Sequence, residues 1–135
     1  MSLSEERKNE LVQIAKEVRK WAYAPYSHYL VGAALETKSG RIYDGVNVEN
    51  AAYPVTICAE RTAVFKAVSN GERDFSAIAV VTKNGGTPCG SCRQVLAEFN
   101  PEMLVIIANE VGEITSETKV SDLLPGAFRS DSLIK

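Results

Sequence analysis

Hydrophobic residues near the start of the chain recur every three or four positions, which is the spacing of an amphipathic helix. The pattern covers residues 4–22 and is followed by Pro25, so we expect the helix to end before this proline. Either Ser4 alone or a capping box of Ser2 and Glu5 is expected to cap its N-terminus. The chain is therefore predicted to open with a helix that has one apolar face.

Three later segments are also predicted to be helical. The segment 57–69 carries regularly spaced apolar residues and is followed by Asn70-Gly71, which is a strong signal for the end of a helix. The segment 89–99 follows a loop that contains glycine and proline, and residues 120–124 are expected to form a last helical turn. Helices are thus expected both before and after the middle of the chain.

Short apolar runs between turn residues predict strands. They are expected at residues 29–35, 41–46, 75–81, 103–108 and 113–118. A Lys-Ser-Gly turn joins the first two as a hairpin, and the third and fourth are apolar at nearly every position, as in strands buried on both faces. Because strands alternate with helices after this hairpin, the pattern predicts an α/β sandwich with parallel later strands, in a single domain over residues 1–135.

The composition limits the classes of partner. The 135 residues carry a net charge of −2 with both signs interspersed, whereas proteins that bind nucleic acid usually present a basic surface. No apolar run approaches the roughly 20 residues that span a bilayer, and the charged N-terminus lacks the apolar core of a signal peptide. An odd number of cysteines, three, favours metal binding in a reducing compartment over a disulfide framework. We therefore expect a cytoplasmic protein that acts on a small molecule, without a nucleic-acid or membrane partner.

All three cysteines lie in two short segments that suggest a metal site. Cys58-Ala59-Glu60 is followed later by Pro88-Cys89-Gly90-Ser91-Cys92. Three thiolates can hold Zn²⁺ and leave its fourth tetrahedral position open, as in catalytic zinc sites. A glutamate two residues after one ligand is placed to act as a base on a water in that position, and this layout is described for zinc deaminases of nucleobases. The spacing therefore points to hydrolytic deamination.

The predicted helices explain how the three thiolates would meet. Cys58 and Cys89 are expected near two helix N-termini, whose partial positive charge lowers thiol pKa values, and Cys92 lies one turn further on the same helix face as Cys89. Three thiolates around Zn²⁺ leave one net negative charge, which a guanidinium bonded to a thiolate would offset. Arg61 is the first candidate for this role and Arg93 the second.

Other interpretations of these residues stay open at this point. Cys-x-x-Cys alone also occurs in redox pairs, although this leaves Cys58 and Glu60 unexplained. A structural zinc site normally uses four protein ligands, so a carboxylate or His28 would have to be the fourth. For His28 we favour a role other than that of a zinc ligand. Glu60 could also be a glutamate favoured only by the helix dipole.

At a larger scale the sequence resembles the small, zinc-dependent cytidine deaminases that act on free nucleosides. The similar segments are residues 24–35, 45–54, 57–63, 88–94 and 123–128. The resemblance implies a three-layer α/β/α sandwich with a mixed sheet of about five strands. It also implies a homotetramer with active sites at subunit interfaces, one Zn²⁺ per subunit, and hydrolysis of cytidine and 2′-deoxycytidine to uridine nucleosides and ammonia in pyrimidine salvage.

The resemblance also implies roles for individual residues. It places the zinc ligands on Cys58, Cys89 and Cys92 and the general acid/base on Glu60. It gives Arg61 the role of reducing the negative charge of the thiolates. Asn47 and Glu49 would bind the ribose hydroxyls. Tyr29, where phenylalanine is common, would pack on the pyrimidine, and Phe128 would reach the site of a neighbouring subunit.

Alternatives to these roles are structural or concern the substrate. Asn47 and Glu49 could belong to a polar turn, and Tyr29 and Phe128 could be core residues. Ser91 and Leu30 stand where alanine and proline are frequent, which leaves the chemistry unchanged. A deaminase of this fold could instead act on another aminopyrimidine, such as a nucleoside antibiotic, or on a base within nucleic acid. The chain could also be a zinc-binding module without enzymatic activity.

Overall fold

A computed structural model describes residues 3–133, and its centre is a five-stranded mixed sheet with the order β2-β1-β3-β4-β5. The strands are β1 Gly32–Thr37, β2 Ile42–Val46, β3 Phe75–Val81, β4 Leu104–Ala108 and β5 Ile114–Lys119. β1 is antiparallel to both β2 and β3, while β3 and β4 are parallel. The predicted hairpin and mixed sheet are therefore confirmed.

The prediction that the later strands are parallel is wrong for β5, which is antiparallel to β4. Only five residues separate the two strands, and within them the N–H of Gly112 donates to the carbonyl of Asn109 at 2.9 Å. A parallel neighbour needs a crossover of a dozen or more residues. A connection this short can therefore join only antiparallel strands.

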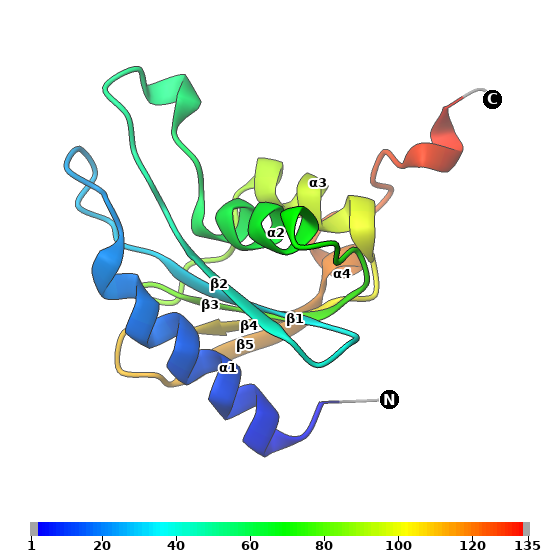
Figure 1. Cartoon of the computed structure of the whole chain (residues 1–135), viewed down its shortest axis with the longest axis horizontal. Helices are drawn as coiled ribbons and strands as arrows, with labels where there is room; N and C mark the ends of the chain where they lie inside the picture. Colours follow the sequence, from blue (N-terminus) through cyan, green and yellow to red (C-terminus); the bar gives the residue numbers. More distant parts are fainter. Residues whose placement is uncertain (1–2, 134–135) are drawn as a thin grey trace.

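Helices cover both faces of the sheet and complete the predicted three layers (Figure 1). They are α1 Glu5–Val18, α2 Ala59–Ser69, α3 Gly90–Phe99 and the short α4 Val120–Leu123, with 3₁₀ turns at Arg19–Trp21, Tyr53–Val55 and Ser130–Ser132. α1 lies on one face, and α2 and α3 lie on the other (Figure 1). No helix within residues 3–133 is long and apolar enough to cross a membrane.

The first helix begins with the plain cap that the sequence offered as one option. The side chain of Ser4 accepts a hydrogen bond from the backbone N–H of Arg7 at 3.1 Å. Ser2, the alternative start, lies outside the described residues. The predicted helix over 4–22 divides into α1 and the following 3₁₀ turn, which ends before Pro25 as expected.

The hydrophobic core has two parts, one on each side of the sheet. In β3, Ile78 and Val80 belong to the cluster under α2 and α3, whereas Ala77, Ala79 and Val81 belong to the cluster under α1. All five are at most 1% exposed, so the expectation of a strand buried on both faces is confirmed.

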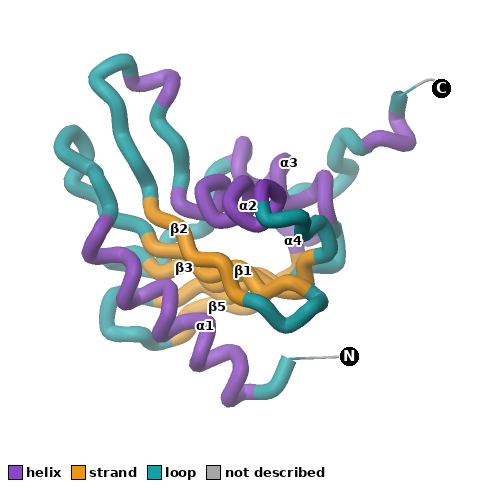
Figure 2. The backbone as a smooth tube through the Cα atoms, viewed as in Figure 1, coloured by secondary structure: helices purple, strands orange, loops and turns teal. Residues whose placement is uncertain are grey.

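The strand expected at 29–35 begins only at Gly32, where the pairing with β2 and β3 starts, and the side chain of Asn47 binds the residues before it. The side chain of Asn47 donates to the carbonyl of Tyr29 at 2.8 Å and accepts from the N–H of Val31 at 2.9 Å. Figure 2 shows the loops 22–31 and 47–58 beyond the same end of the sheet. Backbone bridges from Val48 to Tyr23 and Ile57 join these loops, and they form one end of the molecule.

Candidate active site

Two helix N-termini bring the three cysteines together. Cys58 is the N-cap of α2 and Cys89 the N-cap of α3, both in extended conformation, and Cys92 is in the first turn of α3. The Sγ atoms of Cys58 and Cys89 are 3.8 Å apart, and those of Cys89 and Cys92 are 3.5 Å apart. The predicted convergence of these residues at two helix starts is confirmed.

The spacing of the sulfur atoms fits zinc. Tetrahedral Zn²⁺ with Zn–S bonds of about 2.3 Å requires neighbouring sulfurs about 3.8 Å apart. All three sulfurs lie within 4.8 Å of one another, and theirs is the only group of three or more potential metal ligands among residues 3–133. His28 is not part of it. The cluster can therefore supply three thiolate ligands and leave a fourth position to a non-protein ligand.

Arg61 is the cation beside this cluster. Its guanidinium donates from Nη2 to Sγ of Cys58 at 3.3 Å. Hydrogen bonding from Cys92, together with Arg61, lowers the pKa of the Cys58 thiol to about 5, so that this ligand is available as a thiolate at neutral pH. The hydrogen bond with Cys58 and burial raise the pKa of the Cys92 thiol instead.

Arg93, the second candidate, makes contacts of another kind. Its Nε donates to the carbonyl of Pro88 at 2.8 Å, and its Nη1 donates to the carbonyl of Leu123 at 2.9 Å. Its Nη2 donates to the hydroxyl of Thr87 at 3.1 Å. Arg93 thus braces the turn before Cys89 against the end of α4, while Arg61 contacts the sulfur.

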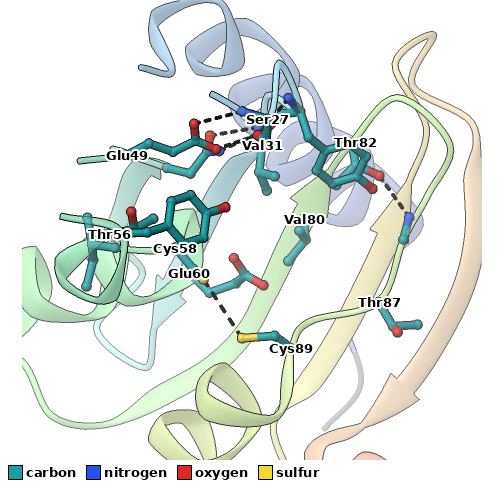
Figure 3. Close-up of a pocket in the computed structure, with 15 residues that line it drawn as sticks. Ser27, Val31, Glu49, Thr56, Cys58, Glu60, Val80, Thr82, Thr87 and Cys89 are labelled. Carbon is teal, nitrogen blue, oxygen red and sulfur yellow. Dashed lines mark hydrogen bonds between the residues drawn. The ribbon is translucent and has the colours of Figure 1, made fainter. Parts of the chain in front are cut away.

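Glu60 is buried beside the sulfur cluster. It lies in the first turn of α2 with 4% of its surface exposed. Figure 3 shows its carboxyl group between Cys58, Cys89 and Val80, directed into a cavity. Burial raises the pKa of this carboxyl to about 7, which suits a group that takes up and releases protons near neutral pH. The dipole-only interpretation does not account for an acid buried at this place.

The cavity in front of Glu60 measures about 260 Å³ and has polar groups on the opposite wall. Asn47 and Glu49 line that wall, with exposed fractions of 8% and 4%. One carboxylate oxygen of Glu49 accepts from the N–H groups of Tyr26 and Ser27 at 3.0 and 3.1 Å, and the other accepts from the Ser27 hydroxyl (Figure 3). These bonds, chiefly the one from the hydroxyl, lower the pKa of Glu49. Both side chains are therefore fixed pocket groups rather than a solvated turn.

The two aromatic candidates occupy different places. Tyr29 lines the cavity and is 39% exposed. Phe128 is 58% exposed and belongs to the segment after α4, where its carbonyl accepts from Nε2 of Gln94 at 2.8 Å. It does not line this cavity. Neither residue is a core residue, so that alternative is wrong for both.

Sequence reasoning missed the hydroxyl groups of the cavity. Ser27 holds Glu49, while Thr82 and Thr87 line the wall next to Cys89 (Figure 3). Thr82 directly follows the apolar strand β3, and the carboxyl ends of parallel strands commonly face the ligand in α/β sheets. That position was the available signal for Thr82. Ser27 gave none, because its role depends on a partner 22 residues away.

Comparison with known proteins places this site in a family. Residues 5–108 match the family described as "Cytidine and deoxycytidylate deaminase zinc-binding region". A cytidine deaminase from Sporosarcina psychrophila is 54% identical over 127 residues, which cover 92% of this chain and 93% of that protein. A blasticidin-S deaminase from Bacillus cereus is 35% identical, with 86% and 88% covered.

A solved structure agrees with the sequence matches. The crystal structure of cytidine deaminase from Burkholderia pseudomallei superposes with a TM-score of 0.85 at 46% identity, covering 93% of this chain and 100% of that one. The similarity thus extends over the sheet, the helices and the loops that form the cavity. The chain belongs to the zinc-binding cytidine and deoxycytidylate deaminase family.

Proposed function

We propose that the protein is a zinc-dependent hydrolase that converts cytidine and 2′-deoxycytidine to uridine and deoxyuridine with release of ammonia. The observation that carries this proposal is the buried Glu60 between three converging cysteine sulfurs and a cavity with polar groups on its far wall. The names of the similar proteins from Sporosarcina psychrophila and Burkholderia pseudomallei support the same activity.

In the proposed mechanism, Cys58, Cys89 and Cys92 would hold one Zn²⁺ per subunit. When bound, zinc lowers the pKa of a water ligand toward about 7 and so provides a nucleophile at neutral pH. Glu60, buried beside these ligands, would take up a proton from the attacking water and deliver it to ring N3 as the bond to C4 forms. Glu60 then carries the second proton to the departing amine as the C4–N bond breaks. Arg61 offsets the thiolate charge through its bond to Cys58.

The far wall of the cavity would bind the sugar. Glu49 is held as a carboxylate and can accept a further hydrogen bond from a ribose hydroxyl, because each oxygen has two lone pairs. Asn47 uses one N–H for Tyr29 and has a second N–H to donate. The ring of Tyr29, which lines the same cavity, would pack on the pyrimidine.

The charges around the cavity favour a free nucleoside over a nucleotide or a polymer. Its described lining contains the carboxyl groups of Glu49 and Glu60 but no lysine or arginine. Phosphate groups are usually bound by arginine, lysine or helix N-termini. The two helix N-termini of this cavity carry Cys58 and Cys89, whereas the wall proposed to bind the sugar carries the carboxylate of Glu49, which repels a phosphate. A 5′-phosphate would therefore lose affinity here, and a nucleic-acid strand would meet the same repulsion at each phosphate.

An absorbance assay tests this function directly. We expect the zinc-loaded protein to deaminate cytidine and deoxycytidine, and removal of the metal by a chelator to abolish the activity until zinc is added back. CMP and a single-stranded oligonucleotide at the same concentration should react far more slowly. Preference for either phosphorylated substrate would overturn the nucleoside assignment. Full zinc occupancy with no deamination of any nucleoside would indicate a non-enzymatic module.

The similarity to blasticidin-S deaminase supports a second candidate substrate, an aminopyrimidine nucleoside antibiotic. The comparison of kcat/KM for cytidine and for blasticidin S decides between the two. The higher identity to the cytidine deaminase leads us to expect a preference for cytidine. A larger kcat/KM for blasticidin S than for cytidine would make the antibiotic the assigned substrate.

We further infer that the chain is a single domain over residues 1–135 and assembles as a homotetramer whose active sites lie at subunit interfaces. Support comes from Phe128, which is exposed and lies outside the cavity of its own chain. The free thiols of Cys58, Cys89 and Cys92 support a cytoplasmic location, where thiols stay reduced and pyrimidine salvage would supply the substrate. Neither nucleic acids nor membranes are expected partners.

A further inference from the structure

The side chain of Tyr29 reaches the loop that leads to Cys89. Its hydroxyl donates to Oδ1 of Asn84 at 2.8 Å, across 55 positions of sequence. Within the loop, the N–H of Gly86 donates to Oγ1 of Thr82 at 2.8 Å, and Thr82 is 3% exposed. The phenolic hydroxyl therefore connects one wall of the cavity to a loop that is itself anchored at the buried end of β3.

The loop is shaped around this hydroxyl. A Cβ atom at Gly86 would lie 2.6 Å from Oη of Tyr29, which is closer than such atoms approach without displacement. A methyl group at this position would therefore displace the phenol, whose hydroxyl is the movable end of its side chain. The contact is thus specific to tyrosine, since a phenylalanine ring would leave the space beside Gly86 unfilled and would leave Oδ1 of Asn84 with only the longer bond from the Thr82 hydroxyl at 3.5 Å.

The backbone of Tyr29 is held by the opposite side of the cavity. Its carbonyl accepts from Nδ2 of Asn47 at 2.8 Å, and its N–H donates to Oγ of Ser27 at 3.0 Å. Ser27 in turn donates to Glu49. Tyr29 therefore joins the wall proposed to bind ribose to the loop that contributes Gly86, Thr87 and Cys89 to the cavity.

We propose that the Tyr29 hydroxyl is a positioning group that sets nucleoside affinity by fixing loop 82–88 through Asn84. The inference rests on the proposed function, because the affinity in question is that for cytidine. The hydroxyl contacts neither Glu60 nor a cysteine, so it acts on substrate binding rather than on proton transfer. The aromatic ring alone can pack on a pyrimidine, whereas the hydroxyl determines how closely the loop encloses it.

A double-mutant cycle tests the link. One neutral hydrogen bond contributes enough to change an affinity by about two- to tenfold. We expect Tyr29→Phe and Asn84→Ala each to raise KM for cytidine by such a factor and to change kcat by less than about twofold. The double variant should be no worse than the poorer single variant. Independent, multiplying effects, or a loss in kcat with KM unchanged, would overturn the proposal.

Gly86→Ala provides a second double-mutant cycle, in which Tyr29→Phe should improve the affinity for cytidine instead of weakening it. Its methyl group should displace the phenol and raise KM, and Tyr29→Phe in the same chain should restore part of the affinity because it removes the colliding oxygen. Absence of any recovery would contradict the proposal. If Gly86→Ala does not fold, the cycle with Asn84 decides alone.

Two further measurements separate this role from general stability and from the proposed function. Amide exchange at Gly86 in the substrate-free protein should be faster in Tyr29→Phe, because the loop loses its outer attachment; unchanged exchange would count against the link. Tyr43→Phe is the matched control and should leave KM unchanged, because it removes a hydroxyl that donates to Glu72 at 3.5 Å and neither residue lines the cavity. Failure of the wild type to deaminate cytidine would refute the function. An active wild type with an unaltered Tyr29→Phe variant would refute only the link.

Discussion

Glu49 is a carboxylate whose protonation state is set by its neighbours. Its two oxygens accept from the backbone of Tyr26 and Ser27 and from the Ser27 hydroxyl, all of which favour the charged form. The pKa of Glu49 is therefore lower than in the unfolded chain. Protonation of Glu49 would weaken these bonds and so loosen both its side chain and the segment that leads to Tyr29.

This shift predicts how Glu49 affects stability at different pH values. Because its folded-state pKa is depressed, ionised Glu49 stabilises the fold above the unfolded pKa of about 4.3, and this contribution is lost as pH falls through the folded pKa. We expect acidification from pH about 7 to about 3.5 to lower the free energy of unfolding more in the wild type than in Glu49→Gln. Urea unfolding at both pH values measures the difference. Glu98→Gln, on the exposed face of α3, controls for net charge, and equal losses in wild type and Glu49→Gln would contradict the prediction.

At the scale of elements, the site depends on how closely α2 approaches the sheet. A Cβ atom at Gly45 in β2 would lie 2.5 Å from the backbone nitrogen of Ala63 and 2.6 Å from the carbonyl oxygen of Ala59. Glycine thus permits a backbone contact between β2 and α2. The same helix presents Cys58 at its N-terminus, so its distance from the sheet also sets the position of one sulfur relative to Cys89.

Gly45→Ala tests this dependence. The added methyl group would push α2 outward, and such overpacking typically costs about 1–3 kcal/mol of stability. We expect a lower melting temperature and weaker retention of zinc during dialysis against a chelator. Gly90→Ala is the control, because a Cβ there meets no atom within 4 Å, and its melting temperature should not fall below the wild-type value. Unchanged stability and zinc retention in Gly45→Ala would show that α2 can shift without cost.

The elements also show which parts of the structure could be predicted from sequence. Periodicity and turn residues give α2, α3, β3 and β4 to within two residues, because these segments bury regular apolar faces. The start of β1 could not be predicted, since it depends on where the pairing with β2 and β3 starts, and the side chain of Asn47 binds the residues before it. The direction of β5 was open to prediction from its short connection to β4.

The candidate site also has parts that could be predicted from sequence and parts that could not. The spacing of the cysteines and Glu60 indicated a zinc centre because ligands and base lie on two helix starts, where local sequence fixes geometry. The partners of Ser27 and Tyr29 could not be predicted, because both bonds join segments far apart in the chain. Only the assembled fold brings those segments together.

At the scale of the whole molecule, the C-terminal segment extends away from the layers (Figure 1). Phe128 lies on it, exposed and outside the cavity of its own chain. Such a residue would complete a site only if another subunit received it. The proposed tetramer therefore makes a prediction about mixed assemblies that a monomer does not.

Coexpression of Phe128→Ala and Glu60→Gln chains tests this arrangement. Each variant alone should have low activity, the first because every site lacks the aromatic ring and the second because every site lacks the base. In mixed tetramers, some sites receive Glu60 from one chain and Phe128 from the other, so the activity per chain should exceed the mean of the two separate variants. Activity equal to that mean, or full activity of Phe128→Ala alone, would contradict a shared site.

The most direct test of the central claim is the turnover of cytidine by Glu60→Gln with its zinc content measured in the same sample. Glutamine keeps the shape of the buried side chain but cannot take up the proton, and general acid–base catalysis typically contributes about 10²- to 10⁴-fold. We predict one zinc per chain, as in the wild type, with kcat lower by at least about 10²-fold. A variant that retains zinc and turns over cytidine at a rate near that of the wild type would contradict the account.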